Sequence, residues 1–426
     1  MRNFSDKYRI LLYNPILVYF FLLVGVSLLA IASSFPLSLA QYPDSGNFVI
    51  RQLTFFLIGG IFLFIILLFG MERIRYFRWL IYGVCLSLLL MIFAHDHIPG
   101  ISFNMVRNVN GATRWLDFDP IPLTLQPSEF MRIALILVSA DIIQKHNAKY
   151  LTRTTKTDLH LIAKVLAITL PPAVLIYRQP DSGITILILL TAAIMLLGAG
   201  IQWRYILTVG GIAIITIGSF LFLVRYHQDF LINGLGIEPY RIARFNGWFD
   251  PFGTISGDGH QLSRGLVAIG SGGIFGHGFQ GDAIRFPESH TDFIFAVIGK
   301  DFGLFGAMGV IILCLLFDFE ILNTAALNRG KYNSVVCIGI FASLIGQQFW
   351  NIGMCLGMLP ISGVTLPFIS HGGSSVLSSM IILGLILASF AEGAKIKQTN
   401  SNYQEHILYL KTKSYLKDDP KGIRGK

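Results

Sequence analysis

The amino-acid sequence predicts an all-α polytopic membrane protein with about ten transmembrane helices. Of its 426 residues, 53% are hydrophobic and only 13% are charged, whereas roughly 25% are charged in a typical soluble domain. A soluble chain of this length would form two or three domains with charged surfaces, and so few charges cannot cover them. The chain also contains ten apolar runs, most of them close to the ~20 residues that cross the hydrocarbon core of a bilayer.

Each apolar run is expected to form one helix. The runs lie at about 14–36, 52–71, 79–95, 130–144, 159–177, 184–200, 205–225, 303–325, 334–356 and 375–390. An even number of spans places both termini on the same side of the membrane. Basic residues then orient the chain, because 22 of the 33 Lys and Arg lie in the first residues, in alternate short connections and in the last residues. The positive-inside rule assigns these segments, and therefore both termini, to the cytoplasm.

The same pattern divides the chain into a transmembrane domain, residues 1–392, and a basic cytoplasmic tail, residues 393–426. The long connections face outward, at about 96–129, about 226–302 between the seventh and eighth helices, and 357–374. Function tends to lie on loops held by a rigid scaffold, so we expect the chemistry outside the cytoplasm. The net charge of +9 follows from the cytoplasmic segments and does not indicate nucleic-acid binding.

Other signatures exclude further classes of site. The four cysteines lie in or beside apolar runs without C-x-x-C spacing, so neither a zinc site nor a disulfide framework is indicated. The glycine-rich stretch Gly270–Gly278 fits neither the dinucleotide fingerprint nor the phosphate loop. We therefore expect no nucleotide on the outer face.

Polar residues cluster before and at the start of the fourth helix. Arg114 and Trp115 could bind an anionic headgroup that carries sugar, Arg114 through a bidentate grip and Trp115 by stacking. Glu129 and Arg132 follow at the helix start and lie on one helix face. The alternative is structural: an ordinary capped helix with an interfacial Trp anchor.

Two further segments place polar residues near the outer surface. Asp181 lies in Gln179–Gly183, which a turn alone explains. Asp292 follows His290 and precedes the apolar run Phe293–Ile298, so its carboxylate is expected to be partly desolvated, which raises its pKa and suits a general base. A helix-capping Asp is the alternative.

The last outer segment, residues 357–375, has two prolines and several glycines within apolar sequence. Irregular backbone at membrane depth is tolerated where it is buried in protein or lines a cavity. We expect a cavity wall here. The amides near Ser374 and Ser375, which open the last helix, could hold a phosphate.

Taken together, these segments resemble the SEDS family of proteins, represented by RodA, FtsW and SpoVE. The matching stretches, in the family's order, are Asn110–Trp115, Gln126–Glu129, Gln179–Gly183, Gly270–Gly278, Pro287–Phe295 and Asn351–Ser375. The resemblance implies a peptidoglycan glycosyltransferase of the bacterial cytoplasmic (inner) membrane that polymerises lipid II on the outer face, paired with a class B penicillin-binding protein. It implies that Asp292 is the essential acid. The expected substrate-binding residues are Arg114, Trp115, Glu129, Arg132, Asp181, His290, Ser374 and Ser375.

Three positions depart from the family pattern. Arg132 stands where a Lys is usual and keeps the charge. Lys300-Asp301 stands where two acids are usual, which puts in question a partner or cation contact there. His371 replaces the usual Tyr before Gly-Gly-Ser-Ser.

The expected reaction is a displacement in which Asp292 removes the proton from the acceptor 4-hydroxyl. The pyrophosphate leaves as an anion, so one carboxylate suffices, unlike in sugar hydrolysis. Arg114, Arg132 or a divalent cation, Mg²⁺ or Mn²⁺, would stabilise the leaving group; no organic cofactor is expected.

Two alternative functions stay open: a lipid II flippase or other transporter, and a noncatalytic scaffold of the divisome or elongasome. Residues Ile269–Gly273 favour the elongation, RodA-like role over the division role.

Overall fold

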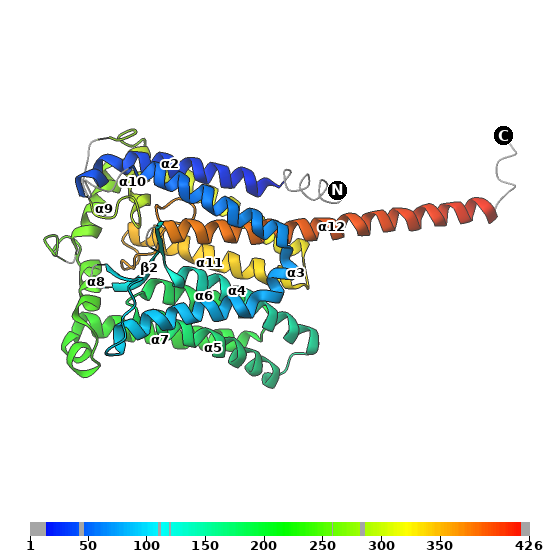
Figure 1. The fold of residues 1–426 in the computed structure, drawn as a ribbon, viewed down its shortest axis with the longest axis horizontal. Coiled ribbons are helices and arrows are strands. Elements are labelled where there is room, and N and C mark those ends of the chain that lie inside the picture. Colours follow the sequence, from blue (N-terminus) through cyan, green and yellow to red (C-terminus); the bar gives the residue numbers. More distant parts are fainter. Residues whose placement is uncertain are drawn as a thin grey trace.

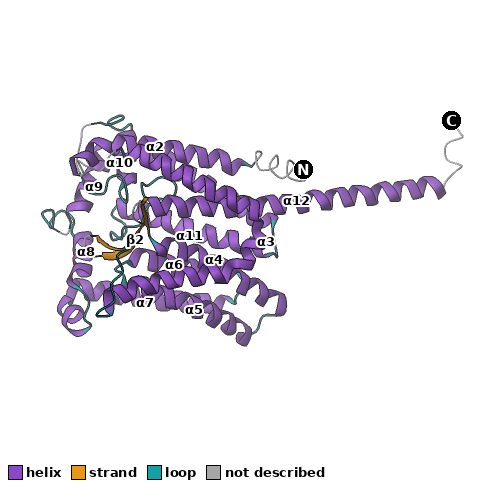
Figure 2. Ribbon diagram, in the orientation of Figure 1, coloured by secondary structure: helices purple, strands orange, loops and turns teal. Residues whose placement is uncertain are grey.

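The computed structural model of the chain describes residues 14–41, 47–109, 112–118, 121–257, 259–281 and 286–418. It is a bundle of long helices that carries short helices and a small sheet at one end (Figures 1 and 2). The long helices are α2 (Pro15–Gln41), α3 (Phe48–His97), α4 (Pro127–Lys149), α5 (Thr155–Arg178), α6 (Ser182–Gly198), α7 (Trp203–Tyr226), α10 (Ile294–Leu327), α11 (Tyr332–Cys355) and α12 (Gly373–Asp418). The short helices are η1 (Phe230–Gly234), α8 (Pro239–Phe249) and α9 (His260–Ser271).

Seven helices among the described residues are long and apolar enough to cross a membrane: α2, α3, α5, α7, α10, α11 and α12. The chain is thus a mostly helical, multi-pass membrane protein. The predicted count of ten spans is not confirmed. α6 is apolar but has only 17 residues, and the charged side chains of α4 reduce its hydropathy. α3 contains two of the predicted runs, 52–71 and 79–95, and Gly70, near the end of the first run, interrupts the helix with a φ of 72°.

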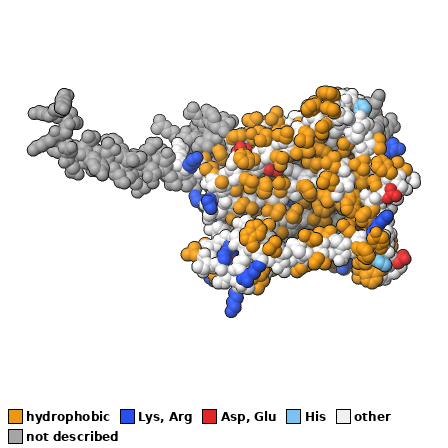
Figure 3. Space-filling model, turned by 180° about the vertical axis from the view of Figure 1, so that it is seen from behind, with side chains coloured by type: hydrophobic (Ala, Val, Ile, Leu, Met, Phe, Trp, Pro, Cys, Tyr) orange, Lys and Arg blue, Asp and Glu red, His pale blue; other side chains and the backbone are white. Residues whose placement is uncertain are grey.

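The two ends of the bundle differ. α2 begins at the same end from which α12 leaves, and the sheet, α8 and α9 lie at the opposite end (Figure 1). From behind, hydrophobic side chains cover the middle of the molecule, and Lys and Arg gather toward the end with α12 (Figure 3). α12 continues as one helix from Gly373 to Asp418, so the predicted domain boundary at residue 393 falls inside a helix.

A three-stranded antiparallel sheet corrects the all-α prediction. Its strands, β1 (Val106–Val109), β2 (Ala112–Phe118) and β3 (Ile121–Leu125), lie in the order β1-β2-β3. Asn110 and Gly111, which belong to the predicted motif, lie outside the described residues. Leu116 is fully buried, and Trp115 pairs with Arg107 of β1. The sheet therefore gives Arg114 a fixed backbone before the chain enters α4.

α10 begins at Ile294, nine residues before the predicted start at residue 303. It is helical on both sides of Gly303, whose φ is 64°. The break exposes carbonyl groups, and the preceding glycine-rich loop satisfies them. His277 N–H donates to the Lys300 carbonyl at 3.0 Å and Gly278 N–H to the Asp301 carbonyl at 2.9 Å. The outer loop predicted to extend to residue 302 therefore ends at the start of this helix.

The glycine-rich loop must contact α10 closely. A Cβ on Gly276, whose φ is +79°, would lie 2.2 Å from the Asp301 carbonyl oxygen. The role of this stretch is thus structural, in agreement with its mismatch to nucleotide motifs. Lys300 and Asp301 form an ion pair here at 2.9 Å, with both side chains buried. Ser33 of α2 also donates to Asp301, so this pair joins α2 to α10.

Replacing Gly276 by Ala should destabilise the protein, because the site needs both a positive φ and close backbone contact. A strained backbone position alone costs about 1–3 kcal/mol. We expect a lower melting temperature of the detergent-purified Gly276→Ala protein. Gly270→Ala is the matched control, since no atom lies within 4 Å of its Cβ position. Equal melting temperatures for the two variants would contradict the packing described.

Candidate functional site

Asp292 lies immediately before α10, and its backbone is held by the last outer segment. The carbonyls of three successive residues, His290, Thr291 and Asp292, each accept a hydrogen bond from residues far along the chain. The donors are, in order, His371 N–H at 2.9 Å, Ser370 Oγ at 2.7 Å and Asn351 Nδ2 at 2.7 Å. Asn351 also donates to the Val364 carbonyl at 2.7 Å. The segment that carries Asp292 is therefore fixed against α11 and residues 364–371.

The Asp292 carboxylate is half-buried and faces Gly363. A Cβ at Gly363, whose φ is +72°, would lie 3.4 Å from Asp292 Oδ2. The capping residue of α10 is Phe293, without a side-chain hydrogen bond. Within the part of the chain that the structure describes, the Asp292 carboxylate makes no hydrogen bond. The geometry does not support the capping role considered from the sequence.

The surroundings of Asp292 raise its pKa to about 7. Burial is the largest cause, and the negative charge of Glu288 adds to it. The positive charges of Arg114 and Arg244 lower the pKa and limit the rise. At neutral pH the carboxylate is thus ionised in a large fraction of molecules and still basic enough to accept a proton.

Arg114 and Asp181 come together beside this carboxylate. The Arg114 guanidinium lies 4.3 Å from the centre of the Trp115 ring and 4.0 Å from Asp181 Oδ1. The Arg114 side chain is 22% exposed, whereas that of Asp181 is 5% exposed. Arg114 is therefore held by stacking and by charge, yet keeps part of its surface accessible.

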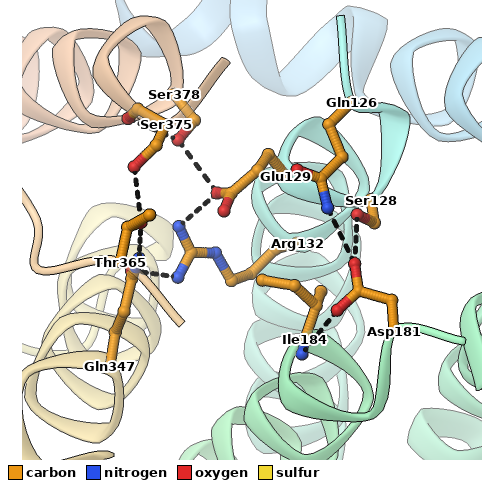
Figure 4. A network of polar contacts seen from close by, with 10 residues as sticks. All are labelled: Gln126, Ser128, Glu129, Arg132, Asp181, Ile184, Gln347, Thr365, Ser375 and Ser378. Carbon is orange, nitrogen blue, oxygen red and sulfur yellow. Dashed lines mark hydrogen bonds and ion pairs between the residues drawn. The ribbon is translucent and has the colours of Figure 1, made fainter. Parts of the chain in front are cut away.

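Asp181 caps α6 at the turn that the sequence predicts, and it also contacts the start of α4. It caps α6 by accepting a hydrogen bond from Ile184 N–H at 3.3 Å. Its other oxygen accepts from Gln126 Nε2 at 2.7 Å and from Ser128 Oγ at 3.2 Å (Figure 4). Asp181 thus joins α6 to the start of α4.

Glu129 and Arg132 form the centre of a buried network (Figure 4). Arg132 is 1% exposed and Glu129 is 4% exposed. Arg132 Nη2 donates to Glu129 Oε2 at 2.8 Å, and Nη1 donates to Gln347 of α11. Ser378 of α12 donates to Glu129 Oε2 at 3.1 Å. The network connects α4, α11 and α12 inside the bundle.

Ser374 and Ser375 connect this network to the outer segments. Ser374 Oγ accepts from Gln126 N–H at 2.8 Å and donates to the Thr124 carbonyl at 2.9 Å. Ser375 Oγ lies 2.8 Å from Thr365 Oγ1. Both hydroxyls are therefore engaged within the protein.

His290 and His371 are buried beside Phe48 of α3. Their ring centres are 5.7 Å apart, and the His290 ring lies 4.4 Å from that of Phe48. Burial lowers the pKa of His290 and lowers that of His371 to about 3. Both rings are neutral at pH 7. His371 Nδ1 lies 3.0 Å from Gln52 Oε1.

Sequence reasoning missed Arg244 of α8 as a residue of this site. Its charge acts on Asp292 together with that of Arg114. The usable signal was the spacing of Arg241 and Arg244, which places two arginines on one face of a helix in the large outer loop. Among the described residues, no group of three or more His, Cys, Asp or Glu could hold a metal ion.

The fold and the site define a polytopic membrane protein in which an acid with a raised pKa, Asp292, is under the influence of two arginines at the end of the bundle that carries the sheet. A family profile described as "Cell cycle protein", FtsW/RodA/SpoVE, matches residues 14–393. The chain belongs to this family.

Individual proteins of known name or structure are similar to this chain over most of its length. The chain is 32% identical to the "Probable peptidoglycan glycosyltransferase FtsW" of Thiomicrospira cyclica over 87% of this chain and 89% of the relative. Two solved structures share its fold. One, described as "Structural coordination of polymerization and crosslinking by a peptidoglycan synthase complex", has a TM-score of 0.68 at 23% identity and covers 89% of this chain and 97% of that one. The other, the rod shape determining protein RodA of Thermus thermophilus, has a TM-score of 0.58 at 24% identity and covers 88% and 94%. The RodA-like assignment within the family is not confirmed.

Proposed function

We propose that this chain is a peptidoglycan glycosyltransferase that polymerises lipid II into β-1,4 glycan strands at the outer face of the bacterial cytoplasmic membrane. Family membership and the names of its relatives support the reaction class. The observation that carries the assignment of the site is Asp292, an acid whose pKa burial raises to about 7 and on which the positive charges of Arg114 and Arg244 act.

In the proposed reaction, Asp292 accepts the proton of the acceptor 4-hydroxyl as that oxygen attacks the anomeric carbon of the donor. The bond from the anomeric carbon to the pyrophosphate oxygen breaks, and the configuration inverts from α to β. The leaving group departs as an anion and requires no general acid. A base contributes about 10²–10⁴ in rate to such a step.

We assign the leaving pyrophosphate to Arg114 and Arg244. These two arginines act electrostatically on Asp292, and Arg114 is partly accessible. Arg132 is engaged by Glu129 and Gln347 inside the bundle, so we assign it the role of holding α4 against α11. Preorganised cations of this kind stabilise developing negative charge.

We also propose that the chain crosses the membrane ten times, with both termini in the cytoplasm. Ten spans with cytoplasmic termini agree with the bundle, since α3 passes through it twice, on either side of Gly70.

A class B penicillin-binding protein is the proposed partner, and the similar synthase complex, described as coordinating polymerization and crosslinking, supports it. Relatives named FtsW favour the division role over elongation. Mg²⁺ is often held by one or two carboxylates together with substrate phosphates, so a requirement for Mg²⁺ or Mn²⁺ stays a prediction that chelation tests.

Asp292→Asn should abolish measurable polymerisation of lipid II by the purified protein. Asn keeps the size of the side chain, and the Asp292 carboxylate makes no hydrogen bond among the described residues that the change would remove, so expression, membrane insertion and melting temperature should stay unchanged. The loss expected for a general base is about 10²–10⁴-fold. A variant that polymerises within a few-fold of the parent would return Asp292 to a structural role and favour a transporter or a scaffold.

The rate of polymerisation should rise with pH through about 7, because the base must be ionised and its pKa is raised to about 7. Glu288→Gln removes a negative charge that raises this pKa, so the rise should move to lower pH. Arg114→Gln removes a positive charge that lowers it, so the rise should move to higher pH. Shifts in the same direction for both variants would be incompatible with the electrostatics described.

Arg114→Ala and Arg244→Ala should each weaken the use of lipid II by at least about tenfold in kcat/KM, as expected when a charge-assisted contact is lost. Arg107→Ala is the matched control. Arg107 belongs to the adjacent strand of the same sheet and forms an exposed ion pair with Asp117, at 58% and 35% side-chain exposure. Equal effects at the three positions would count against the assignment of the pyrophosphate.

A further inference from the structure

A cluster of basic residues lies at the end of the bundle from which α12 leaves, far from the site described above (Figure 1). Arg75 and Arg78 of α3 and Lys145 of α4 all pair with one carboxylate, Asp141. The distances are 2.7 Å from Arg75 Nη2, 2.7 Å from Arg78 Nη2 and 2.9 Å from Lys145 Nζ. Three positive charges thus share one negative charge.

The acid of this cluster is buried, whereas the cations reach the surface. The Asp141 side chain is 3% exposed, compared with 14% for Arg78, 33% for Arg75 and 61% for Lys145. Asp141 therefore fixes the cations from the inside. The excess of two positive charges is presented outward.

The cations are also preorganised and have donors to spare. Arg75 donates to Gln144 Oε1 at 2.9 Å, and its guanidinium lies 4.7 Å from the centre of the Tyr332 ring. Arg78 Nη1 donates to the Arg75 carbonyl, and the Lys145 side chain, at 61% exposure, keeps its ammonium group accessible. Two rigid guanidinium groups and a mobile ammonium group match the oxygens of a phosphate.

Two further acids near α3, Glu392 and Glu72, form no ion pair with these cations among the described residues. Glu392 of α12 accepts from Met71 N–H at 2.9 Å and from Asn333 Nδ2 at 2.8 Å, so it caps the second half of α3. Glu72 is exposed, lies three residues before Arg75 and six before Arg78, and forms an ion pair with neither in the described part of the chain.

Exposed aromatic and aliphatic side chains adjoin the cluster on α3. Tyr76 is 78% exposed, Trp79 is 48% exposed and Leu80 is 61% exposed. Trp and Tyr are enriched where the bilayer meets water. The basic cluster thus lies at the level of lipid headgroups, beside a surface suited to acyl chains.

We propose that Arg75, Arg78 and Lys145 form a binding site for the phosphate of an anionic lipid headgroup. Basic pockets between transmembrane helices on the cytoplasmic side bind such headgroups in general. Asp141 of α4 positions the site through its ion pairs with Arg75 and Arg78 of α3. This site is independent of the proposed glycosyltransferase activity.

Native mass spectrometry of the full-length, detergent-purified protein tests this proposal, with dioleoyl phosphatidylglycerol and phosphatidylcholine as competing probes. The parent should retain phosphatidylglycerol selectively. Lys145→Gln should weaken this retention about fivefold, the expected effect of one basic residue near an anionic surface. Arg75→Gln/Arg78→Gln/Asp141→Asn, which leaves no buried unpaired acid, should weaken it by more than about tenfold, given two such contacts.

The matched control is Arg329→Gln/Lys331→Gln, which removes two exposed basic residues from the turn between α10 and α11. It should leave retention of phosphatidylglycerol within about twofold, since neither side chain forms an ion pair with another described residue. Equal losses in control and triple variant, or no loss in Lys145→Gln, would overturn the proposal. Displacement of the lipid by millimolar inorganic phosphate would overturn the lipid assignment in favour of a free anion. Lys145→Gln decides the outcome if the triple variant does not fold.

Discussion

The site depends on the fixation of three successive backbone carbonyls, those of residues 290–292, by α11 and the last outer segment. Irregular backbone within an apolar bundle is stable only when its polar groups are paired. Here each pairing also connects Asp292 to an element far along the chain. The carboxylate is thus placed where little water reaches it, without a hydrogen bond that would consume its basicity.

The electrostatics of the site follow from this placement. Burial and Glu288 raise the pKa of Asp292 to about 7, and Arg114 and Arg244 prevent a larger rise. The same arginines are suited to a pyrophosphate leaving group, so one pair of cations would tune the base and stabilise the leaving anion. The network around Glu129 and Arg132 is buried and joins α4, α11 and α12.

The sequence predicted the helices well because apolar runs of bilayer length have few alternatives, and it predicted the desolvation of Asp292 because polar and strongly apolar residues adjoin there. It did not reveal the sheet, whose strands are short and lie between turns. It placed Arg132 and Arg114 at one substrate group, since both follow matched motifs, whereas three-dimensional packing buries Arg132. Arg244 was missed because only tertiary structure brings α8 to Asp292.

The central claim is that Asp292 titrates near neutral pH, and infrared difference spectroscopy of its carboxyl group tests this most directly. The spectrum of the parent minus that of Asp292→Asn should show a protonated carboxyl band that disappears as pH rises through about 7. Loss of that band near pH 4, the ordinary value for Asp, would contradict the account, because the carboxylate would then be solvated and a poor base.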